Sequence, residues 1–238
     1  MMKLNERLRQ IAAFVPQGAR IADIGTDHAY LPVFLVQQNV VSWAIAGDVH
    51  EGPYKAASLT VRQAGLSDKI SVRLGDGLTV IGEDEIDAVV IAGMGGQTMI
   101  EILQKGELWI KRLTTLVLQP MGAAGALRLW LVKHGWQLID EALVIDDDRL
   151  YEVICAKRSI SGQGTLSVET EITEAEKILY EVGPILLRKQ DPLLSQHIGQ
   201  KINDTKRILT QLNNAGIGAQ EKTIVLKRQL QQLKELLP

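Results

Sequence analysis

The sequence has few of the features that mark a secreted or membrane protein. Among its 238 residues there is one cysteine, Cys155, so no internal disulfide can form, and a reducing compartment is the natural setting. No apolar run comes near the roughly 18 residues that a membrane-spanning helix needs. The first ten residues, MMKLNERLRQ, are polar with a helical pattern, unlike a signal peptide. We therefore expect a cytoplasmic protein that does not contact a membrane.

The chain also lacks a strong excess of either charge. Its 26 Lys and Arg residues nearly balance 28 Asp and Glu residues, for a formal net charge of −2. A nucleic-acid partner would therefore need a local basic patch. Hydrophobic residues make up 46% of the chain, and no charge-rich disordered tract interrupts them. This length and composition predict one medium domain, alone or with a small appendage.

The stretch DIGTDHAYLP, residues 23–32, organises the rest of the chain. An apolar run at residues 19–22 precedes it and a helical pattern at residues 31–38 follows it, which predicts a strand, a tight turn and a helix. Such a turn brings backbone N–H groups to a ligand at the carboxyl edge of a sheet. The glycine-rich pattern of NAD-binding turns is missing, because only Gly25 is present. Acidic Asp23 before that glycine is typical of S-adenosylmethionine-binding turns, although a generic nucleotide-binding α/β fold stays open.

Two further strands are predicted to end in carboxylates at the same sheet edge. Residues 42–49 read as a strand ending near Asp48, 25 positions beyond Asp23, where a carboxylate can accept hydrogen bonds from ribose hydroxyls. Residues 70–78 read as a third strand that closes in Gly75-Asp76-Gly77. In this fold class that position meets an adenine.

The fourth predicted strand, residues 86–96, is almost continuously apolar, as expected for a strand that is covered on both faces. It ends in Gly93-Met94-Gly95-Gly96, which lets a ligand approach the backbone closely. Amino-directed nucleic-acid methyltransferases often carry Asn/Asp-Pro-Pro-aromatic here, so that side-chain clamp for an exocyclic amine is absent. A fifth strand is predicted at residues 114–120.

Further elements complete the predicted sheet domain. The acidic triplet Asp146-Asp147-Asp148 joins two strands and reads as a solvated hairpin tip rather than a metal site, because no second ligand cluster follows. That hairpin would form the antiparallel end of a seven-stranded sheet. Helices are predicted at residues 3–15, 53–64 and 122–134, and the hairpin strands at residues 135–145 and 150–158.

The last part of the chain has no strand signal. A polar linker at residues 159–163 leads to predicted helices at residues 173–189, 192–214 and 219–237. Gly216 and Gly218 mark a turn, so the last two helices read as an antiparallel hairpin resembling a coiled coil. Solvated charge is the default interpretation of its basic residues, and a clamp on folded RNA is the alternative. The basic candidates for RNA contact are Arg7 and Arg9 near the N-terminus, and Lys201, Lys206, Arg207, Lys222, Lys227 and Arg228 on what we expect to be the outer helix faces.

Taken together, these motifs resemble the bacterial tRNA adenine-N1 methyltransferases of the TrmK type, which modify adenine 22 in the D-arm. The resemblance runs through DIGTDHAYLP, the GDGL and AGMGG loops, LQP, YEVI and the helical C-terminal hairpin. It implies an α/β fold with a Rossmann-like, S-adenosylmethionine-binding domain at residues 1–158. It also implies a helical domain at residues 159–238 that binds tRNA.

The same resemblance implies roles for residues that match the motifs. The amino-acid end of S-adenosylmethionine would be held by Asp23, Gly25, Asp27 and His28, and its ribose by Asp48. Its adenine would lie by Asp76 and Gly77, its sulfonium by Gly93 and Met94, and Gln119 and Pro120 would border the opening for the target adenine. The resemblance supplies no catalytic base, and the candidates nearest the reaction are Asp27, Met94 and Gln119. No metal is expected.

The chemistry can proceed without a general base. Adenine N1 carries a free lone pair that can attack the methyl group in line, so positioning and electrostatics would supply the rate. Asp27 could stabilise the cationic product, and His28 could orient the cofactor or the adenine, or shuttle a proton. N1 is a pairing atom, so the adenine must be unpaired or extruded first.

Three other functions stay open at this point. A non-enzymatic RNA-binding protein could retain the fold, and the glycine loop without a catalytic side chain is compatible with it. A dinucleotide-dependent oxidoreductase would require the glycines that the first turn lacks. A methyltransferase for a small molecule would not need the basic helical hairpin. Oligomeric state is left open, with a monomer favoured.

Overall fold

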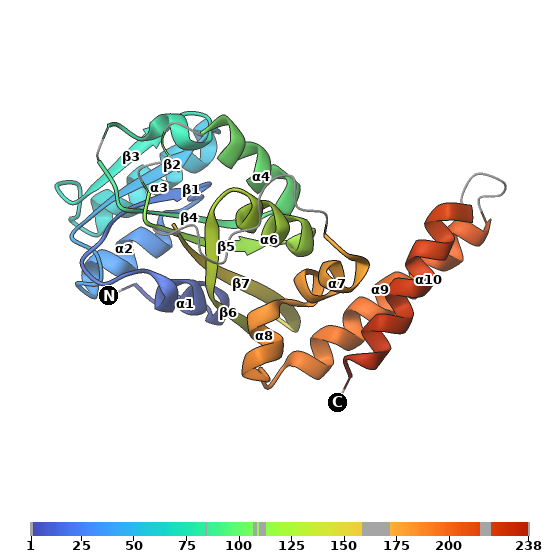
Figure 1. Cartoon of the computed structure of the whole chain (residues 1–238). Helices are drawn as coiled ribbons and strands as arrows, with labels where there is room; N and C mark the ends of the chain where they lie inside the picture. Colours follow the sequence, from blue (N-terminus) through green and yellow to red (C-terminus); the bar gives the residue numbers. More distant parts are fainter. Residues whose placement is uncertain are drawn as a thin grey trace.

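The computed structural model describes residues 2–83, 85–106, 109, 113–158, 172–214 and 220–237, and its centre is a seven-stranded sheet (Figure 1). The strand order is β3-β2-β1-β4-β5-β7-β6. Pairing is parallel from β3 to β5, while β7 runs antiparallel to both β5 and β6. This confirms the predicted α/β class and the antiparallel hairpin at one end. The strands are β1 (Arg20–Ile24), β2 (Trp43–Asp48), β3 (Ile70–Leu74), β4 (Ala88–Met94), β5 (Thr115–Pro120), β6 (Trp136–Asp146) and β7 (Arg149–Arg158).

Helices cover the sheet on both faces because successive residues of a strand point to opposite sides. Ile21 of β1 belongs to the core cluster shared with helices α1, α2 and α3, whereas its neighbour Ala22 belongs to the cluster shared with α4 and α6. In β4, Val90 belongs to the first of these clusters and its neighbour Val89 to the second. These helices are α1 (Glu6–Phe14), α2 (Tyr30–Gln37), α3 (Glu51–Gln63), α4 (Gly96–Lys105) and α6 (Ala124–Lys133).

The acidic hairpin tip between β6 and β7 anchors α1. Asp147 and Asp148 have φ angles of 47° and 59°, and Asp146 pairs with Arg149, as in a two-residue hairpin turn with left-handed residues. The Asp146 carboxylate accepts hydrogen bonds from Asn5 Nδ2 (2.7 Å) and from the backbone N–H of Glu6 (3.1 Å). The tip is therefore not merely solvated, because it fixes the start of the N-terminal helix.

The predicted helix at residues 173–189 is two helices, because the chain breaks at Gly183. This residue has φ of +113° and is followed by a proline, so α7 (Glu174–Val182) ends there and α8 (Pro184–Lys189) begins. Val182, Ile185 and Leu186 are buried, so neither helix stands free in solvent. The predicted linker at residues 159–163 lies outside the described residues.

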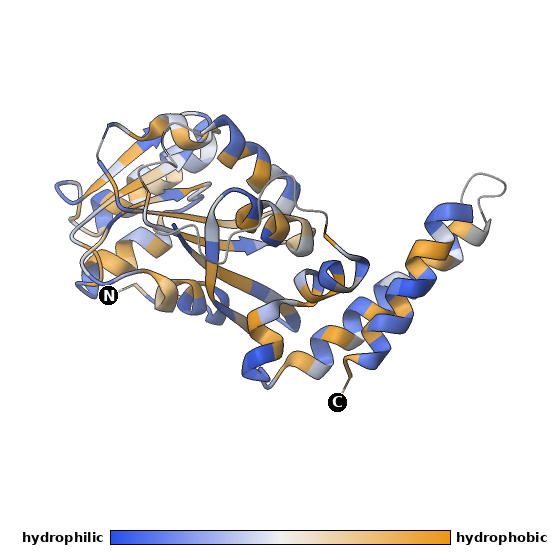
Figure 2. Cartoon of the chain, in the orientation of Figure 1, coloured by the Kyte–Doolittle hydropathy of each residue, from blue (hydrophilic) through white to orange (hydrophobic). Residues whose placement is uncertain are grey.

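The last two helices form the expected hairpin, which projects away from the sheet (Figure 1). Helix α9 spans Leu194–Asn214 and α10 spans Gln220–Glu235, and apolar segments alternate with polar ones along both (Figure 2). Ile198, Ile202 and Leu233 are buried in a small core shared with α7. The predicted turn at Gly216 and Gly218 lies outside the described residues.

Two elements are absent from the prediction. Helix α4 begins directly after the glycine loop that ends β4, and a short 3₁₀ helix spans Gly77–Val80. No helix within the described ranges has the length and apolar character that crossing a membrane requires.

Candidate functional site: the carboxyl edge of the sheet

The turn after β1 folds back onto the end of β2. The backbone N–H groups of Gly25 and Thr26 both donate to the carbonyl of Gly47, at 2.8 and 3.1 Å. Three residues of the turn adopt left-handed conformations, with φ of 75° at Gly25, 54° at Asp27 and 56° at Ala29. The turn is therefore a compact platform over β1 and β2, as the DIGTDHAYLP motif predicts.

Asp23 lies at the end of β1 with only 5% of its surface exposed. Thr26 Oγ1 donates to its Oδ2 at 2.7 Å. Burial raises the pKa of Asp23 to about 6, the hydrogen bond from Thr26 partly opposes this, and the charge of Asp48 adds to it. The charged form of a buried carboxylate of this kind is strongly stabilised when a cation approaches it.

Asp48 ties the end of β2 to the turn. Its carboxylate accepts hydrogen bonds from the backbone N–H of Asp27 (3.3 Å) and of His50 (3.0 Å), and the residue is 8% exposed. Asp23 and Asp48 thus stand at the ends of adjacent strands, on the side of the sheet where the sequence places them.

A cavity of about 430 Å³ lies between this turn, the β4 loop and helix α1. The His28 ring stacks on Tyr30 with centroids 5.1 Å apart, and His28 Nε2 lies 3.7 Å from Asp27 Oδ1. The Asp27 side chain is 71% exposed, so it is free to meet a ligand. Five predicted cofactor residues line the cavity, namely Asp23, Gly25, Asp27, His28 and Gly93, and one residue assigned to RNA contact, Arg7, lines it as well.

The β4 loop closes over the turn. Gly93 has φ of +75°, which suits a residue without a Cβ atom. The Met94 side chain lies against Gly25, since a Cβ atom built on Gly25 would meet Met94 Cε at 2.1 Å. Met94 therefore packs directly on the turn, and unlike Gly93 it is not among the residues that line the cavity.

Gln119 does not border an opening, contrary to expectation. Its side chain is fully buried at the end of β5, where Oε1 accepts a hydrogen bond from Arg7 Nη1 (2.7 Å) and Nε2 donates to the Pro120 carbonyl (3.1 Å). A side chain with no exposed surface cannot touch a target adenine in this conformation. Pro120, the other predicted residue, does line a pocket, although it is not the cavity beside the turn.

Asp76 and Gly77 lie apart from the cavity wall, at the end of β3. The Asp76 side chain is 63% exposed and lies 3.4 Å from Lys105 Nζ. Gly77 has φ of +54°, and a Cβ atom there would come within 3.2 Å of Ile102. Because β3 is the neighbour of β2, these residues extend the same sheet edge outward from Asp48.

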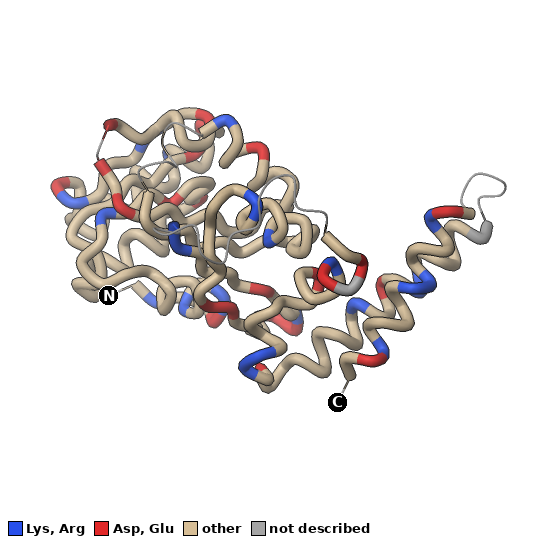
Figure 3. The backbone as a smooth tube through the Cα atoms, in the orientation of Figure 1, with Lys and Arg blue, Asp and Glu red and all other residues tan. Residues whose placement is uncertain are grey.

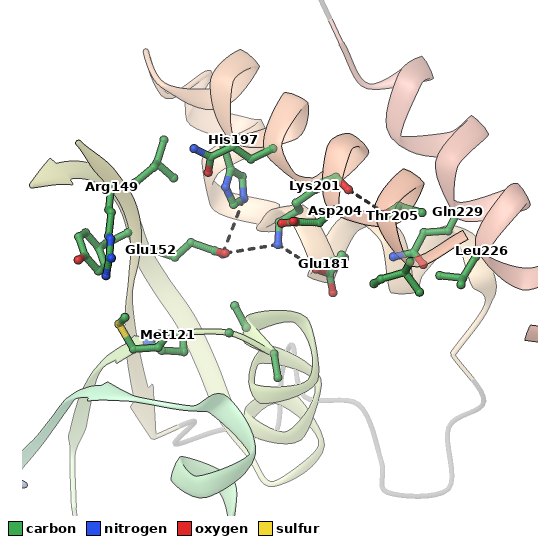
Figure 4. Close-up of a pocket in the computed structure, with 18 of the residues that line it drawn as sticks. Met121, Arg149, Glu152, Glu181, His197, Lys201, Asp204, Thr205, Leu226 and Gln229 are labelled. Carbon is green, nitrogen blue, oxygen red and sulfur yellow. Dashed lines mark hydrogen bonds and ion pairs between the residues drawn. The ribbon is translucent and has the colours of Figure 1, made fainter. Parts of the chain in front are cut away.

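A second pocket, of about 560 Å³, separates the sheet edge from the helical hairpin (Figure 4). The loop after β5 and strand β7 form one side, and α9 and α10 form the other. At its base Lys201 Nζ contacts Glu181 Oε1 (2.8 Å) and Glu152 Oε1 (3.3 Å), while His197 Nε2 lies 3.7 Å from Glu152 Oε2. The pocket floor is therefore an ion-pair network that joins the two parts of the chain.

The expectation that Lys201 lies on an outer helix face is wrong. Its side chain is only 15% exposed, and although burial disfavours its charged form, Glu152 and Glu181 hold its pKa above the usual value. The other predicted basic residues of the hairpin are exposed, and basic positions recur along α9 and α10 (Figure 3). Arg207 pairs with Asp204 at 2.9 Å, and Arg9 pairs with Glu6 at the same distance.

Comparison with known proteins assigns the family. Residues 21–235 match the family model "TrmK: tRNA (adenine(22)-N(1))-methyltransferase". The tRNA (adenine(22)-N(1))-methyltransferase of Bacillus subtilis is 37% identical over 235 residues, which cover 99% of this chain and 93% of that protein.

Two solved structures extend this likeness to the fold. One is Streptococcus pneumoniae Sp1610 in complex with S-adenosyl-L-methionine, with a TM-score of 0.82, 32% identity and 98% of both chains covered. The other is M. capricolum TrmK bound to S-adenosylhomocysteine, with a TM-score of 0.78, 29% identity, and 99% of this chain and 97% of that chain covered. The chain therefore belongs to the TrmK family of tRNA (adenine(22)-N(1))-methyltransferases.

Proposed function

We propose that this protein transfers a methyl group from S-adenosylmethionine to N1 of adenine 22 in the D-arm of tRNA. The observation that carries the proposal is the alignment of Asp23, Asp48 and Asp76 at the ends of three adjacent strands, around a glycine turn, in a chain of this family. Carboxylates in that order suit an ammonium, a ribose and an adenine along one ligand.

The residues at the sheet edge fit this cofactor. Gly25 lines the cavity without a side chain, and buried Asp23 offers a carboxylate to a cation. Asp48 can accept hydrogen bonds from ribose hydroxyls at the end of β2. When bound, S-adenosylmethionine supplies an electrophilic methyl group on its sulfonium.

The protein's contribution to the reaction is positioning and electrostatics. Adenine N1 attacks with its own lone pair, so no side chain has to remove a proton first. The exposed Asp27 carboxylate lies at the cavity wall, where it stabilises the positive charge that the adenine acquires. Gly93 lets the adenine approach the β4 backbone closely.

Cofactor affinity is expected to fall in acid because Asp23 must be charged to bind an ammonium. With a pKa of about 6, Asp23 is mostly ionised at pH 7 and mostly neutral at pH 5. We expect the Kd for S-adenosylhomocysteine to rise about tenfold from pH 7 to pH 5. Titration calorimetry across this range measures it. Asp23→Asn should bind weakly with a flat profile, and an unchanged slope in that variant would assign the effect to another group.

Transfer RNA is proposed to lie across the second pocket and along the helical hairpin. The pocket joins the loop after β5 to α9 and α10, so RNA bound to the hairpin can reach the sheet edge. Exposed Lys206, Lys227 and Arg228 offer phosphate contacts, and Arg207 adds another once it leaves Asp204. Lys201 is not part of this surface because two carboxylates already hold it.

Removing the exposed hairpin charges should weaken tRNA binding without affecting the cofactor. For a triple variant that changes Lys206, Lys227 and Arg228 to Gln, we expect a Kd for tRNA at least tenfold higher at low salt. The salt dependence should also be shallower by about one unit for each phosphate that the variant no longer neutralises. Filter binding at several salt concentrations measures both quantities.

A matched triple variant at exposed positions away from the hairpin, with Lys55, Arg62 and Lys69 changed to Gln, should bind normally. Equal losses in the two triples would remove the hairpin from the RNA surface.

Nucleoside analysis tests the reaction itself. Unmodified tRNA incubated with the protein and labelled S-adenosylmethionine should yield label in 1-methyladenosine after digestion. Label in another nucleoside would discard the proposed specificity.

We propose that the protein acts as a monomer, because α9 and α10 bury part of their apolar stripes together, and that it meets tRNA in the cytoplasm.

A further inference from the structure

We infer that Arg7 binds the carboxylate of the cofactor's amino-acid end, and that Gln119 is a positioning residue that holds Arg7 in place. The inference rests on the proposed function, because it concerns the same cofactor. It departs from the sequence interpretation, in which Arg7 contacts RNA. Four structural features carry it.

The first feature is the charge pattern of the 430 Å³ cavity. Its described lining contains two carboxylates, Asp23 and Asp27, and one Lys or Arg residue, Arg7. The amino-acid end of the cofactor is a zwitterion, with an ammonium and a carboxylate on the same carbon. Asp23 suits the ammonium, so the carboxylate needs a cationic partner nearby, and Arg7 is the cation in this wall.

The second feature is the direction in which the ligand extends. Asp48 at the end of β2 and Asp76, two residues beyond β3, mark the proposed ribose and adenine end. The strand order β3-β2-β1-β4-β5 then places the other end of the ligand over β1, β4 and β5. Arg7 lies there, because its Nη1 donates to Gln119 at the end of β5 and lies 3.7 Å from a Cβ atom built on Gly93 of β4.

The third feature is how firmly Arg7 is placed. Its guanidinium lies 5.5 Å from the centre of the Tyr151 ring, in a cation–π contact. Gln119, which is fully buried, presents its amide oxygen to Arg7 and directs its amide nitrogen to the Pro120 carbonyl. Because the oxygen of this buried glutamine accepts a hydrogen bond from one guanidinium nitrogen, it fixes the orientation of the whole guanidinium group. A guanidinium has five N–H donors in a rigid fork, so others remain for a carboxylate.

The fourth feature is the anchoring of the helix that carries Arg7. Asp146 accepts hydrogen bonds from Asn5 and Glu6 at the start of α1, and Ile11, one helical turn after Arg7, is fully buried. Arg7 is therefore held before the ligand arrives, which lowers the entropic cost of binding.

The test compares two ligands that differ by one carboxylate. These are S-adenosylhomocysteine and its decarboxylated analogue, which keeps the ammonium, and calorimetry gives the Kd of each. The wild-type protein should bind the first about 30-fold more tightly, as expected for a charge-assisted, fork-like contact. Arg7→Ala should lose that difference, with a much higher Kd for S-adenosylhomocysteine and a nearly unchanged Kd for the analogue. Arg7→Lys should recover part of the discrimination.

Two controls separate this role from a structural one. Arg9→Ala removes an exposed arginine from the same helix and should leave both Kd values unchanged. Gln119→Leu should reduce the discrimination while a folded circular-dichroism spectrum is retained. If Arg7→Ala weakens both ligands equally, Arg7 is structural and the inference fails. It also fails if discrimination survives in Arg7→Ala while tRNA affinity drops, since Arg7 would then contact an RNA phosphate. If the wild-type protein binds neither ligand, the cofactor assignment itself fails.

Discussion

Replacing Gly25 with alanine is expected to raise the Kd for S-adenosylhomocysteine about 100-fold, equivalent to about 2.7 kcal/mol. Gly25 has φ of +75°, where a side chain is strained, and its Cβ atom would meet Met94 Cε at 2.1 Å. The turn must therefore adapt to the strain and the end of the Met94 side chain must shift, and Gly25 lines the proposed cofactor cavity. Calorimetry with the wild-type and variant proteins measures the change.

Gly18 provides a matched control for the backbone strain. It has φ of +79°, but a Cβ atom built on it would meet no other atom within 4 Å, so Gly18→Ala carries the strain without the collision. Gly18→Ala should lose about 1 kcal/mol of stability from the strain alone and bind the cofactor normally, and Gly25→Ala should lose more because of the added collision. Adding Met94→Ala to Gly25→Ala should restore part of the affinity. Normal binding by Gly25→Ala alone would contradict the assignment of this turn.

Replacing Arg128 with methionine is expected to destabilise the protein by about 3–5 kcal/mol. Arg128 is fully buried in α6, where it pairs with Glu141 of β6 and, at 2.7 Å, with Glu152 of β7. It also donates to the carbonyl of Tyr180 in α7 (3.1 Å). The variant would leave two largely buried carboxylates without this partner. An apparent Tm lower by roughly 6–20 °C is expected for a chain of this size.

The same network attaches the helical part of the chain to the sheet. Glu141 Oε2 accepts a hydrogen bond from the N–H of Ile185 (2.8 Å) at the start of α8. Arg128→Met should therefore also increase amide hydrogen exchange in α7 and α8. The exposed pair Lys55–Glu51 provides the control, because Lys55→Met should change the Tm by less than about 2 °C. A similarly small effect of Arg128→Met would contradict the role given to the network.

The network also makes the stability of the folded protein depend on pH under acidic conditions. Burial alone would raise the pKa of Glu152, but the charges of Arg128, Lys201 and His197 outweigh it and lower the pKa from 4.5 to about 2. A lowered carboxylate pKa stabilises the fold above the unfolded value, and that stabilisation is lost as the pH falls toward 2. The wild-type protein should therefore lose stability below about pH 4.5, and Arg128→Met should lose less over that range.

Local patterns predicted the sheet and its edge because the signals lie within single segments. The apolar runs of β1 and β4 and the motif DIGTDHAYLP carry their own structure, so Asp23, Gly25 and Asp48 were placed correctly at adjacent strand ends. Helix α4 was missed because two glycines of the β4 loop precede it and a third is its first residue, and glycine is a poor helix former. The break at Gly183-Pro184 has a plain local signal that the helical periodicity obscured.

Contacts between distant segments could not be predicted in this way. The Arg7–Gln119 hydrogen bond joins residues 112 positions apart, and neither residue type indicates the other. The helical spacing of Lys201 predicts a solvated side chain, yet Lys201 is mostly buried and pairs with one carboxylate from β7 and one from α7. These carboxylates come close to Lys201 only in the folded chain. Arg128 likewise reads as a surface arginine of an ordinary helix until its two glutamate partners are located.

The central claim is methyl transfer to N1 of adenine 22, and a pair of unmodified tRNA transcripts tests it most directly. One carries adenine at position 22 and the other carries guanine there, with the rest of the sequence unchanged. The first should accept about one labelled methyl group per molecule, recovered as 1-methyladenosine after digestion, and the second should accept none. Equal labelling of both transcripts, or no labelling of the first by protein that binds S-adenosylhomocysteine, would contradict the account.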